Sequence, residues 1–121
     1  MSDIVVENRE GMPLISIRGE IDQSNAHELE QALGHTLRVG SRFVLLDVSR
    51  LTYMDSAGLS VLLAATRQLR GSGWLGVVNP NSDLYRLFEL VGLTADPGFR
   101  VFEGSSALAD AQAAITEVLG W

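Results

Sequence analysis

In residues 43–63, FVLLDVSRLTYMDSAGLSVLL, one hydrophobic pattern gives way to another. Residues 43–46 are four consecutive apolar side chains, which is typical of a strand covered on both faces of a sheet. After the octet TYMDSAGL, residues 52–59, apolar residues recur every three or four positions, which predicts a helix. A strand followed by a helix is half of a parallel β-α-β unit, so Asp55 and Ser56 are expected at the carboxyl end of a strand.

Two β-branched runs before this stretch predict a hairpin. Residues 4–9 and 14–19 read as strands, and Glu10 and Gly11 between them suit a tight turn. Pro13 has no N–H to donate to a ladder. The second strand is therefore expected to start at a sheet edge or outside the ladder.

Alternating helices and strands are predicted for the rest of the chain. The first helix is expected from Asn25, which has the form of a capping pair with Glu28. Short apolar runs at residues 74–78 and 99–102 predict two further strands. Four predicted helices carry the apolar stripes Ala26, Leu29, Leu33 and Leu37; Leu59, Leu62, Leu63 and Thr66; Leu84, Leu87, Phe88 and Val91; and Leu108, Ala111, Ile115 and Val118.

Together these elements predict an α/β fold in a single domain, residues 1–121. The sheet is expected to be mixed and mostly parallel, with about five strands and four helices in the order ββαβαβαβα. Only the opening hairpin should pair antiparallel, because a helix joins each later pair of strands through a right-handed crossover. Asp22 follows the second strand, so it is expected at the same sheet edge as Ser56.

The charge distribution excludes an ordinary nucleic-acid-binding surface. Formal net charge is −6, lysine is absent, and the nine arginines are scattered along the chain. Nucleic-acid binding needs a basic patch or stripe. The acidic balance favours a protein partner with a basic face.

The apolar runs and the cysteine content predict a cytoplasmic protein without a membrane span. The longest apolar runs, residues 43–46 and 61–65, are far shorter than the roughly 20 residues that a spanning helix needs. The first residues lack the basic and apolar segments of a secretory signal, and the sequence has no cysteine for an oxidising compartment.

No enzyme motif surrounds Ser56. A hydrolase elbow reads G-x-S-x-G, but Met54 stands where the first glycine would be. His27 and His35 lie two helical turns apart without the spacing of a metal site or a reason to approach a serine. The sequence therefore predicts no catalytic residue, no metal and no cofactor.

The sequence also does not fit two other functions that involve phosphate, dinucleotide binding and phosphorylation on aspartate. Residues 71–76 match G-x-G-x-x-G, but a helix precedes and a strand follows, which is the reverse of the dinucleotide-binding order. Asp47, expected at the end of a central strand, raises the alternative of a receiver domain phosphorylated on aspartate. Receivers carry an acidic pair after the first strand and a lysine after the last, and this chain has neither, so Asp47 is predicted to bond turn amides.

Ser56 itself allows two interpretations. Either Asp55 or Ser56 can cap the following helix by accepting hydrogen bonds from its first amides, which is worth about 1 kcal/mol. The same position also presents a serine hydroxyl at a helix start, where the amides and the dipole would tolerate a phosphate. One residue can serve as cap and as switch.

Three segments in order resemble the STAS family, which comprises the anti-sigma factor antagonists and the soluble tails of sulfate transporters. They are GEIDQSNAHEL, residues 19–29, VLLDVSRLTYMDSAGLSVLL, residues 44–63, and LYRLFELVGL, residues 84–93. The resemblance spans nearly the whole chain. It implies a binding protein, not an enzyme.

The resemblance also implies a regulatory cycle. The unphosphorylated protein would bind an anti-sigma factor of the serine-kinase type and so free a sigma factor. That kinase would phosphorylate Ser56 and end the complex, and a metal-dependent serine phosphatase would restore it. Asp22 matches the family's acidic residue beside that serine, and the partner-binding residues expected are Asp22, Asp55, Ser56, Ala57 and Gly58. The protein is expected to be a monomer or a weak dimer.

One residue departs from the regulated pattern and keeps an alternative open. Many regulated members carry Ser or Thr after the phosphorylated serine, and this chain has Ala57. The alternative is a constitutive STAS scaffold or an accessory subunit of a transport or signalling complex. The docking surface is expected at the strand ends near Gly19 and Val48, together with the helix start at Ala57.

Overall fold

The computed structural model describes residues 2–9 and 11–120, so Glu10 of the predicted turn lies outside the described residues, as do Met1 and Trp121. The order of elements in these ranges confirms the predicted ββαβαβαβα fold, with one unpredicted 3-10 helix, η1. The strands are β1 (Ser2–Arg9), β2 (Met12–Ile21), β3 (Phe43–Met54), β4 (Trp74–Val78) and β5 (Phe99–Phe102). The helices are α1 (Ala26–Arg38), α2 (Ser56–Leu69), α3 (Ser82–Leu90), η1 (Leu93–Ala95) and α4 (Ala107–Leu119).

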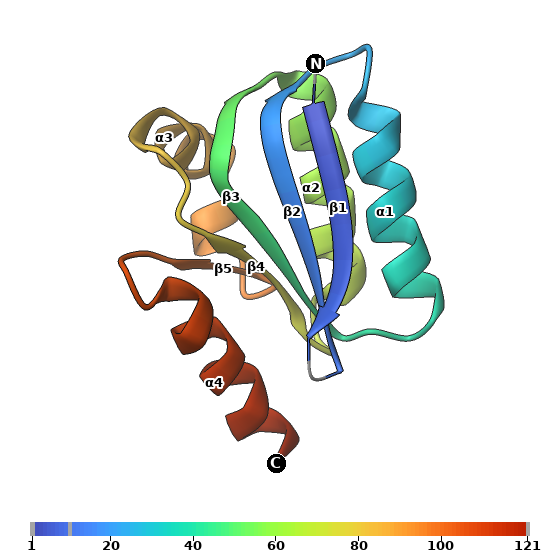
Figure 1. The fold of residues 1–121 in the computed structure, drawn as a ribbon, viewed down its shortest axis with the longest axis vertical. Helices are drawn as coiled ribbons and strands as arrows, with labels where there is room; N and C mark the ends of the chain where they lie inside the picture. The colour runs from blue at the N-terminus through green and yellow to red at the C-terminus, as the bar shows by residue number, and fades with distance from the viewer. Residues whose placement is uncertain (1, 10, 121) are drawn as a thin grey trace.

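The strands lie side by side in the order β1-β2-β3-β4-β5. β1 and β2 pair antiparallel, and the other neighbours pair parallel, as the crossover argument predicts. Because each new strand adds on the same side, right-handed crossovers bring α1, α2 and α3 to one face of the sheet. Figure 1 shows α2 behind β1 and β2, with α1 beside it.

The core is divided between the two faces of the sheet. The larger cluster joins Ile15, Leu46 and their neighbours to α1, α2 and α3, and the smaller one packs Leu45, Trp74 and Phe102 against α4. Residues 43–46 are buried on both sides, which confirms the prediction for this run. No helix in the described ranges is long and apolar enough to span a membrane.

β3 is longer than the sequence pattern predicts. It continues past Asp47 to Met54, because two register shifts against β2 place extra residues on β3. The prediction that Asp47 ends the strand is therefore wrong. Asp47 does bond a backbone amide, but within the strand and not in a turn: its Oδ1 accepts hydrogen bonds from the N–H and Oγ of Ser49, at 3.0 Å and 2.7 Å, beside the first shift.

The strand ends consequently differ from those expected for docking. Gly19 is not a terminus of β2; it has a φ of 96° next to the second register shift, a conformation that favours glycine. β2 and β3 end at Ile21 and Met54 instead of near Gly19 and Val48. β2 also begins earlier, and Pro13 pairs in register with Asn8 of β1 before the ladder with β3 starts.

Three details of the helices also differ from the predictions. Asn25 is the N-cap residue of α1 by position, but its side chain makes no capping hydrogen bond, so the predicted capping pair with Glu28 is wrong. Val91 lies just beyond α3 and is exposed, as is Val118 on α4. Leu93 of η1, which the predicted stripe did not include, is buried in the larger core cluster instead.

Candidate functional site

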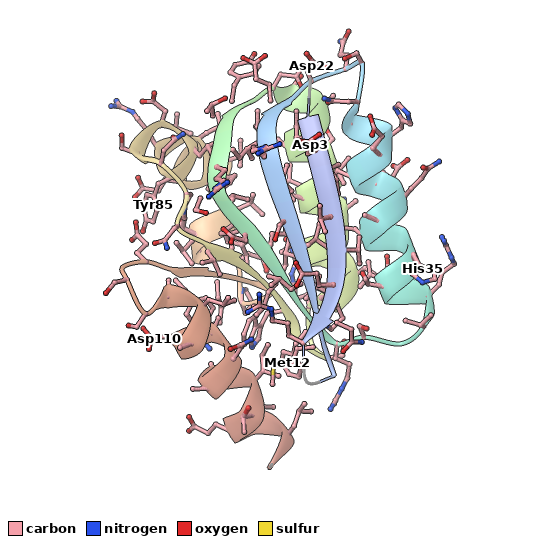
Figure 2. The ribbon with its side chains drawn as sticks, in the orientation of Figure 1. Asp3, Met12, Asp22, His35, Tyr85 and Asp110 are labelled. Atoms are coloured by element: carbon pink, nitrogen blue, oxygen red, sulfur yellow. The ribbon has the colours of Figure 1, made fainter. Side chains whose placement is uncertain are left out.

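The ends of β2 and β3 bring Asp22 and Asp55 to one edge of the sheet. Ile21 pairs with Met54, and the N–H of Asp55 donates to the carbonyl oxygen of Ile21 at 3.1 Å. Each aspartate is the residue after this last pair, so both lie at the same end of the sheet. Figure 2 shows Asp22 at the end of the sheet where α2 begins.

Asp55 is the cap of α2. Its Oδ1 accepts hydrogen bonds from the N–H groups of Ala57 and Gly58, at 2.9 Å and 3.3 Å. Its carbonyl oxygen accepts the first helical hydrogen bond, from the N–H of Leu59 at 3.0 Å. A carboxylate at this position also complements the positive end of the helix dipole. Of the two caps that the sequence allows, the structure therefore selects Asp55.

Ser56 is the first residue of α2 and is exposed. Its carbonyl oxygen accepts a hydrogen bond from Ser60 Oγ at 2.9 Å. Its own Oγ makes no hydrogen bond to any other described residue. Ser56 is thus an exposed residue at a helix start that its neighbour has already capped.

Asp22 lies in a loop held together by side-chain hydrogen bonds. Its Oδ1 accepts from the Oγ and N–H of Ser24, at 2.5 Å and 2.9 Å, and these bonds hold the pKa of the Asp22 carboxyl below its usual value. The Asn25 side chain accepts from the N–H of Asp22 at 2.8 Å and donates to the carbonyl oxygen of Glu20 at 2.9 Å. Asp22 is therefore an ionised, half-exposed carboxylate in a fixed loop.

Gly58 lets the start of α2 approach the strand ends closely. A Cβ at this buried position would lie 2.6 Å from Met54 Cγ and 2.8 Å from Ile21 Cγ2. Ala57 is half-buried and lines a shallow hollow of about 240 Å³ between α1 and α2, together with His27. The structure therefore separates the predicted site residues, because Ala57 lies toward α1 whereas Ser56 lies toward α3.

A groove beside Ser56 is the part of the site that the sequence analysis missed. It runs between the end of β3 and α3 and has a volume of about 580 Å³. Its lining includes buried Met54, Leu59 and Leu84, while Tyr53 and Leu90 are 50% and 74% exposed at its borders. Two residues in the sequence could have indicated this groove: Tyr53, a large side chain inside the octet, and Leu90, an apolar residue outside the apolar stripe of α3.

The charges along this groove are two acids and one base. Asp55, Asp83 and Arg86 line it together with Ser56. Arg86 is exposed and forms no ion pair with an acid in residues 2–9 or 11–120. The groove therefore combines an apolar floor, a free hydroxyl and an uncommitted guanidinium.

A wider hollow of about 770 Å³ lies over β1, β2 and β3 and does not include Ser56. Its lining mixes polar and apolar side chains. Some of its charged groups already have partners, since Arg18 pairs with Asp3 and Asp47 accepts a hydrogen bond from Ser49. His27 and His35 are both exposed on α1, far from a common site. Among the residues that the structure describes, no cluster of His, Cys, Asp or Glu could hold a metal ion.

The order of strands and helices defines an α/β domain of the type found in anti-sigma factor antagonists. The structure aligns with an anti-sigma factor antagonist from Mycobacterium paratuberculosis at a TM-score of 0.80 and 29% identity, covering 94% of this chain and 93% of that one. It shares its fold with the unphosphorylated form of the antagonist SpoIIAA at a TM-score of 0.72 and 20% identity, covering 98% of this chain and all of that one.

The chain belongs to the STAS domain family. Residues 4–101 match the family described as Mlab, STAS domain. The anti-sigma-F factor antagonist RsfB of Mycobacterium tuberculosis is 33% identical over 99 residues, which cover 82% of this chain and 80% of RsfB. The anti-sigma-B factor antagonist of Listeria monocytogenes is 39% identical over 82 residues, which cover 66% of this chain and 71% of the relative. The resemblance of the three quoted segments is thereby confirmed.

Proposed function

We propose that this protein is an anti-sigma factor antagonist, a regulatory binding protein and not an enzyme. In its unphosphorylated form it binds a serine-kinase-type anti-sigma factor, and a sigma factor is released. The names of the relatives support this function, because RsfB and the Listeria protein are both anti-sigma factor antagonists.

The observation that carries the proposal is that Asp55, and not Ser56, caps α2. Asp55 holds the amides of the helix start, and the Ser56 hydroxyl is exposed. A kinase can therefore reach the hydroxyl without breaking the cap. In that step Ser56 Oγ attacks the γ-phosphorus of ATP, the bond to the bridging oxygen breaks, ADP leaves with its electron pair, and the hydroxyl proton passes to a base of the kinase.

Phosphorylation then ends the complex through charge. A phosphoserine carries about −1.5 to −2 charges at neutral pH. It would follow Asp55 directly, at the same end of the sheet as Asp22. A partner that must desolvate this edge meets uncompensated like charges. A serine phosphatase restores the binding form. We place the partner-binding surface on Asp22, Asp55, Ser56, Ala57 and Gly58.

The test uses the kinase-type anti-sigma factors of the source organism, each purified with its sigma factor. We expect the wild-type protein to displace sigma from one of them, and incubation with that kinase and Mg-ATP to add one phosphate to Ser56. Ser56→Ala should displace sigma but accept no phosphate, and Ser56→Glu should keep the wild-type far-UV spectrum and fail to bind. If no anti-sigma factor binds the wild-type protein, the proposal is wrong.

A second candidate is a constitutive STAS scaffold or an accessory subunit of a transport or signalling complex. Two observations favour it: the matching family is described as Mlab, and Ala57 stands where many regulated members carry a hydroxyl. In that case Ser56→Glu would bind the partner as tightly as the wild-type protein does, and no kinase would modify Ser56. Affinity capture followed by mass spectrometry would then identify a transporter ATPase or another assembly in place of a small kinase.

A further inference from the structure

A phosphate on Ser56 finds few free hydrogen-bond donors in the helix start itself. The N–H groups of Ala57 and Gly58 already donate to Asp55, and the N–H of Leu59 donates within the helix. The expectation that these amides would hold a phosphate is therefore not met by the geometry. The new charge would also lie beside Asp55, whose carboxylate occupies the amides. A cation is the group that can compensate it.

Arg86 is the cation that shares a groove with Ser56. Of the residues that line the groove next to Ser56, Arg86 carries the only positive charge. It comes from α3, on the opposite side of the groove from the start of α2. Three other arginines are held by acids, since Arg70 pairs with Asp96, Arg18 with Asp3 and Arg9 with Glu7. Arg86 has no such acid partner among the described residues.

We propose that Arg86 is the internal binding partner of the phosphate on Ser56, and that their ion pair closes the groove between β3 and α3. The guanidinium donates two N–H groups to phosphate oxygens, the geometry that makes arginine a common phosphate ligand. This pair spans the groove from α2 to α3 and covers its apolar floor. The unphosphorylated protein leaves the floor, Tyr53 and Leu90 accessible. The inference rests on the proposed phosphorylation of Ser56 and adds Arg86 as the residue that binds the phosphate.

Closure of the groove gives the switch a second component besides repulsion. In the free hydroxyl form, Arg86 and the apolar floor are both available to a partner. In the phosphorylated form, the guanidinium is engaged and the groove is covered. Phosphorylation would then remove attractive contacts as well as add repulsive charge. Arg86→Gln separates these components, because it removes the internal ion pair and leaves the phosphate in place.

The test uses the full chain with phosphoserine installed at position 56 during translation, so that no kinase is needed. The phosphate is titrated by phosphorus NMR in the wild-type background and in Arg86→Gln. An ion pair stabilises the dianion, so we expect the second pKa of the phosphate to lie about half a pH unit lower with Arg86 than without it. Asp55, Asp83 and Asp22, the acids near the phosphate, are the same in both proteins.

Arg67→Gln is the matched control, since it removes the same charge from the last turn of α2. Arg67 lies eleven residues beyond Ser56, or about 16 Å along the helix, which exceeds the Debye length of about 8 Å at physiological salt. We expect it to leave the phosphate pKa unchanged. Equal values in the wild-type and Arg86→Gln phosphoproteins would overturn the proposal, and so would equal shifts in both arginine variants.

Groove closure is measured separately by the accessibility of Tyr53 to a photoexcited flavin in NMR. Half-buried Tyr85 serves as the internal reference. Phosphorylation should reduce the Tyr53 signal in the wild-type background and not in Arg86→Gln. If Tyr53 stays equally accessible in every form, the groove does not close. Because the phosphoserine is installed during translation, these results are independent of whether a kinase and an anti-sigma factor recognise the protein.

Discussion

Gly58→Ala should destabilise the protein even though alanine is the better helix former. In an open helix position this substitution stabilises by about 0.5 to 1 kcal/mol. At Gly58 the new Cβ would lie 2.6 Å from Met54 Cγ and 2.8 Å from Ile21 Cγ2. Met54 and Ile21 are 3% and 0% exposed, so neither can move into solvent. Overpacking of a buried contact costs about 1 to 3 kcal/mol.

The two effects leave a net loss of about 1 kcal/mol in the free energy of unfolding. For a chain of this size that lowers Tm by roughly 4 °C. Chemical denaturation should give a lower midpoint with an unchanged slope, because the surface exposed on unfolding is the same. The displaced start of α2 should also weaken anti-sigma factor binding, which is a second readout of the same strain.

Gly34→Ala is the internal control, because it makes the same change in the middle of α1. There the new Cβ would come within 3.2 Å of Arg38 Nη1, the mobile end of an exposed side chain that can move away. We expect this variant to be more stable than wild type by about 0.5 to 1 kcal/mol. If Gly58→Ala is stabilised as much as Gly34→Ala, the close approach at Gly58 has no energetic weight and the reasoning fails.

Three further predictions concern the cap, the acids and the partner. Asp55→Ala should lose about 1 kcal/mol of stability, whereas Ser56→Ala should stay within about 0.5 kcal/mol of wild type in urea titrations; equal losses would contradict the assignment of the cap. The hydrogen bond from Arg70 lowers the pKa of Asp96, so the carboxylate stabilises the fold above its ordinary pKa of 3.8, and this contribution disappears as pH falls through the lowered value. Asp96→Asn should therefore lose less stability than wild type when the solution is acidified below about pH 4, and identical acid profiles would refute this. Anti-sigma factor association should slow as salt rises, and Asp22→Asn should reduce that dependence in stopped-flow measurements, whereas rates indifferent to salt would exclude steering by these acids.

The periodicity of the sequence was sufficient for the order of elements but not for the length of β3. Beyond Asp47 the buried residues are Val48, Leu51 and Met54, which recur every three positions. A regular strand alternates every two positions, so this spacing does not look like a strand. The cause is the pair of register shifts against β2, each of which adds one residue to β3. A bulge depends on the neighbouring strand, and a single sequence does not display that neighbour.

The site was predictable where its chemistry lies in adjacent residues. Asp55 and Ser56 are consecutive, and a helix cap is a local interaction, so the octet was enough to propose both roles. The groove is different, because Tyr53 belongs to β3 and Leu90 to α3. Their proximity follows from the packing of α3 beside the end of β3. Leu90 falls outside the apolar stripe that packs α3 onto the core, so the sequence pattern assigned it no role. In the structure it lines the groove.

Asp55 caps α2, whereas the neighbouring Ser56 is the proposed phosphate acceptor. Because the two roles fall on different residues, a charge can be added to Ser56 without unfolding the helix. Had Ser56 been the cap, its phosphorylation would have altered the hydrogen bonds that start α2, and the switch would have acted on stability. With Asp55 in that role, the amides stay satisfied when Ser56 is modified. The energetic consequence of the proposed phosphorylation is then confined to the surface, where Arg86 lines the same groove as Ser56. A Ser56→Glu that keeps the wild-type stability but fails to bind, beside an Asp55→Ala that melts early, is the pair of phenotypes that this arrangement requires.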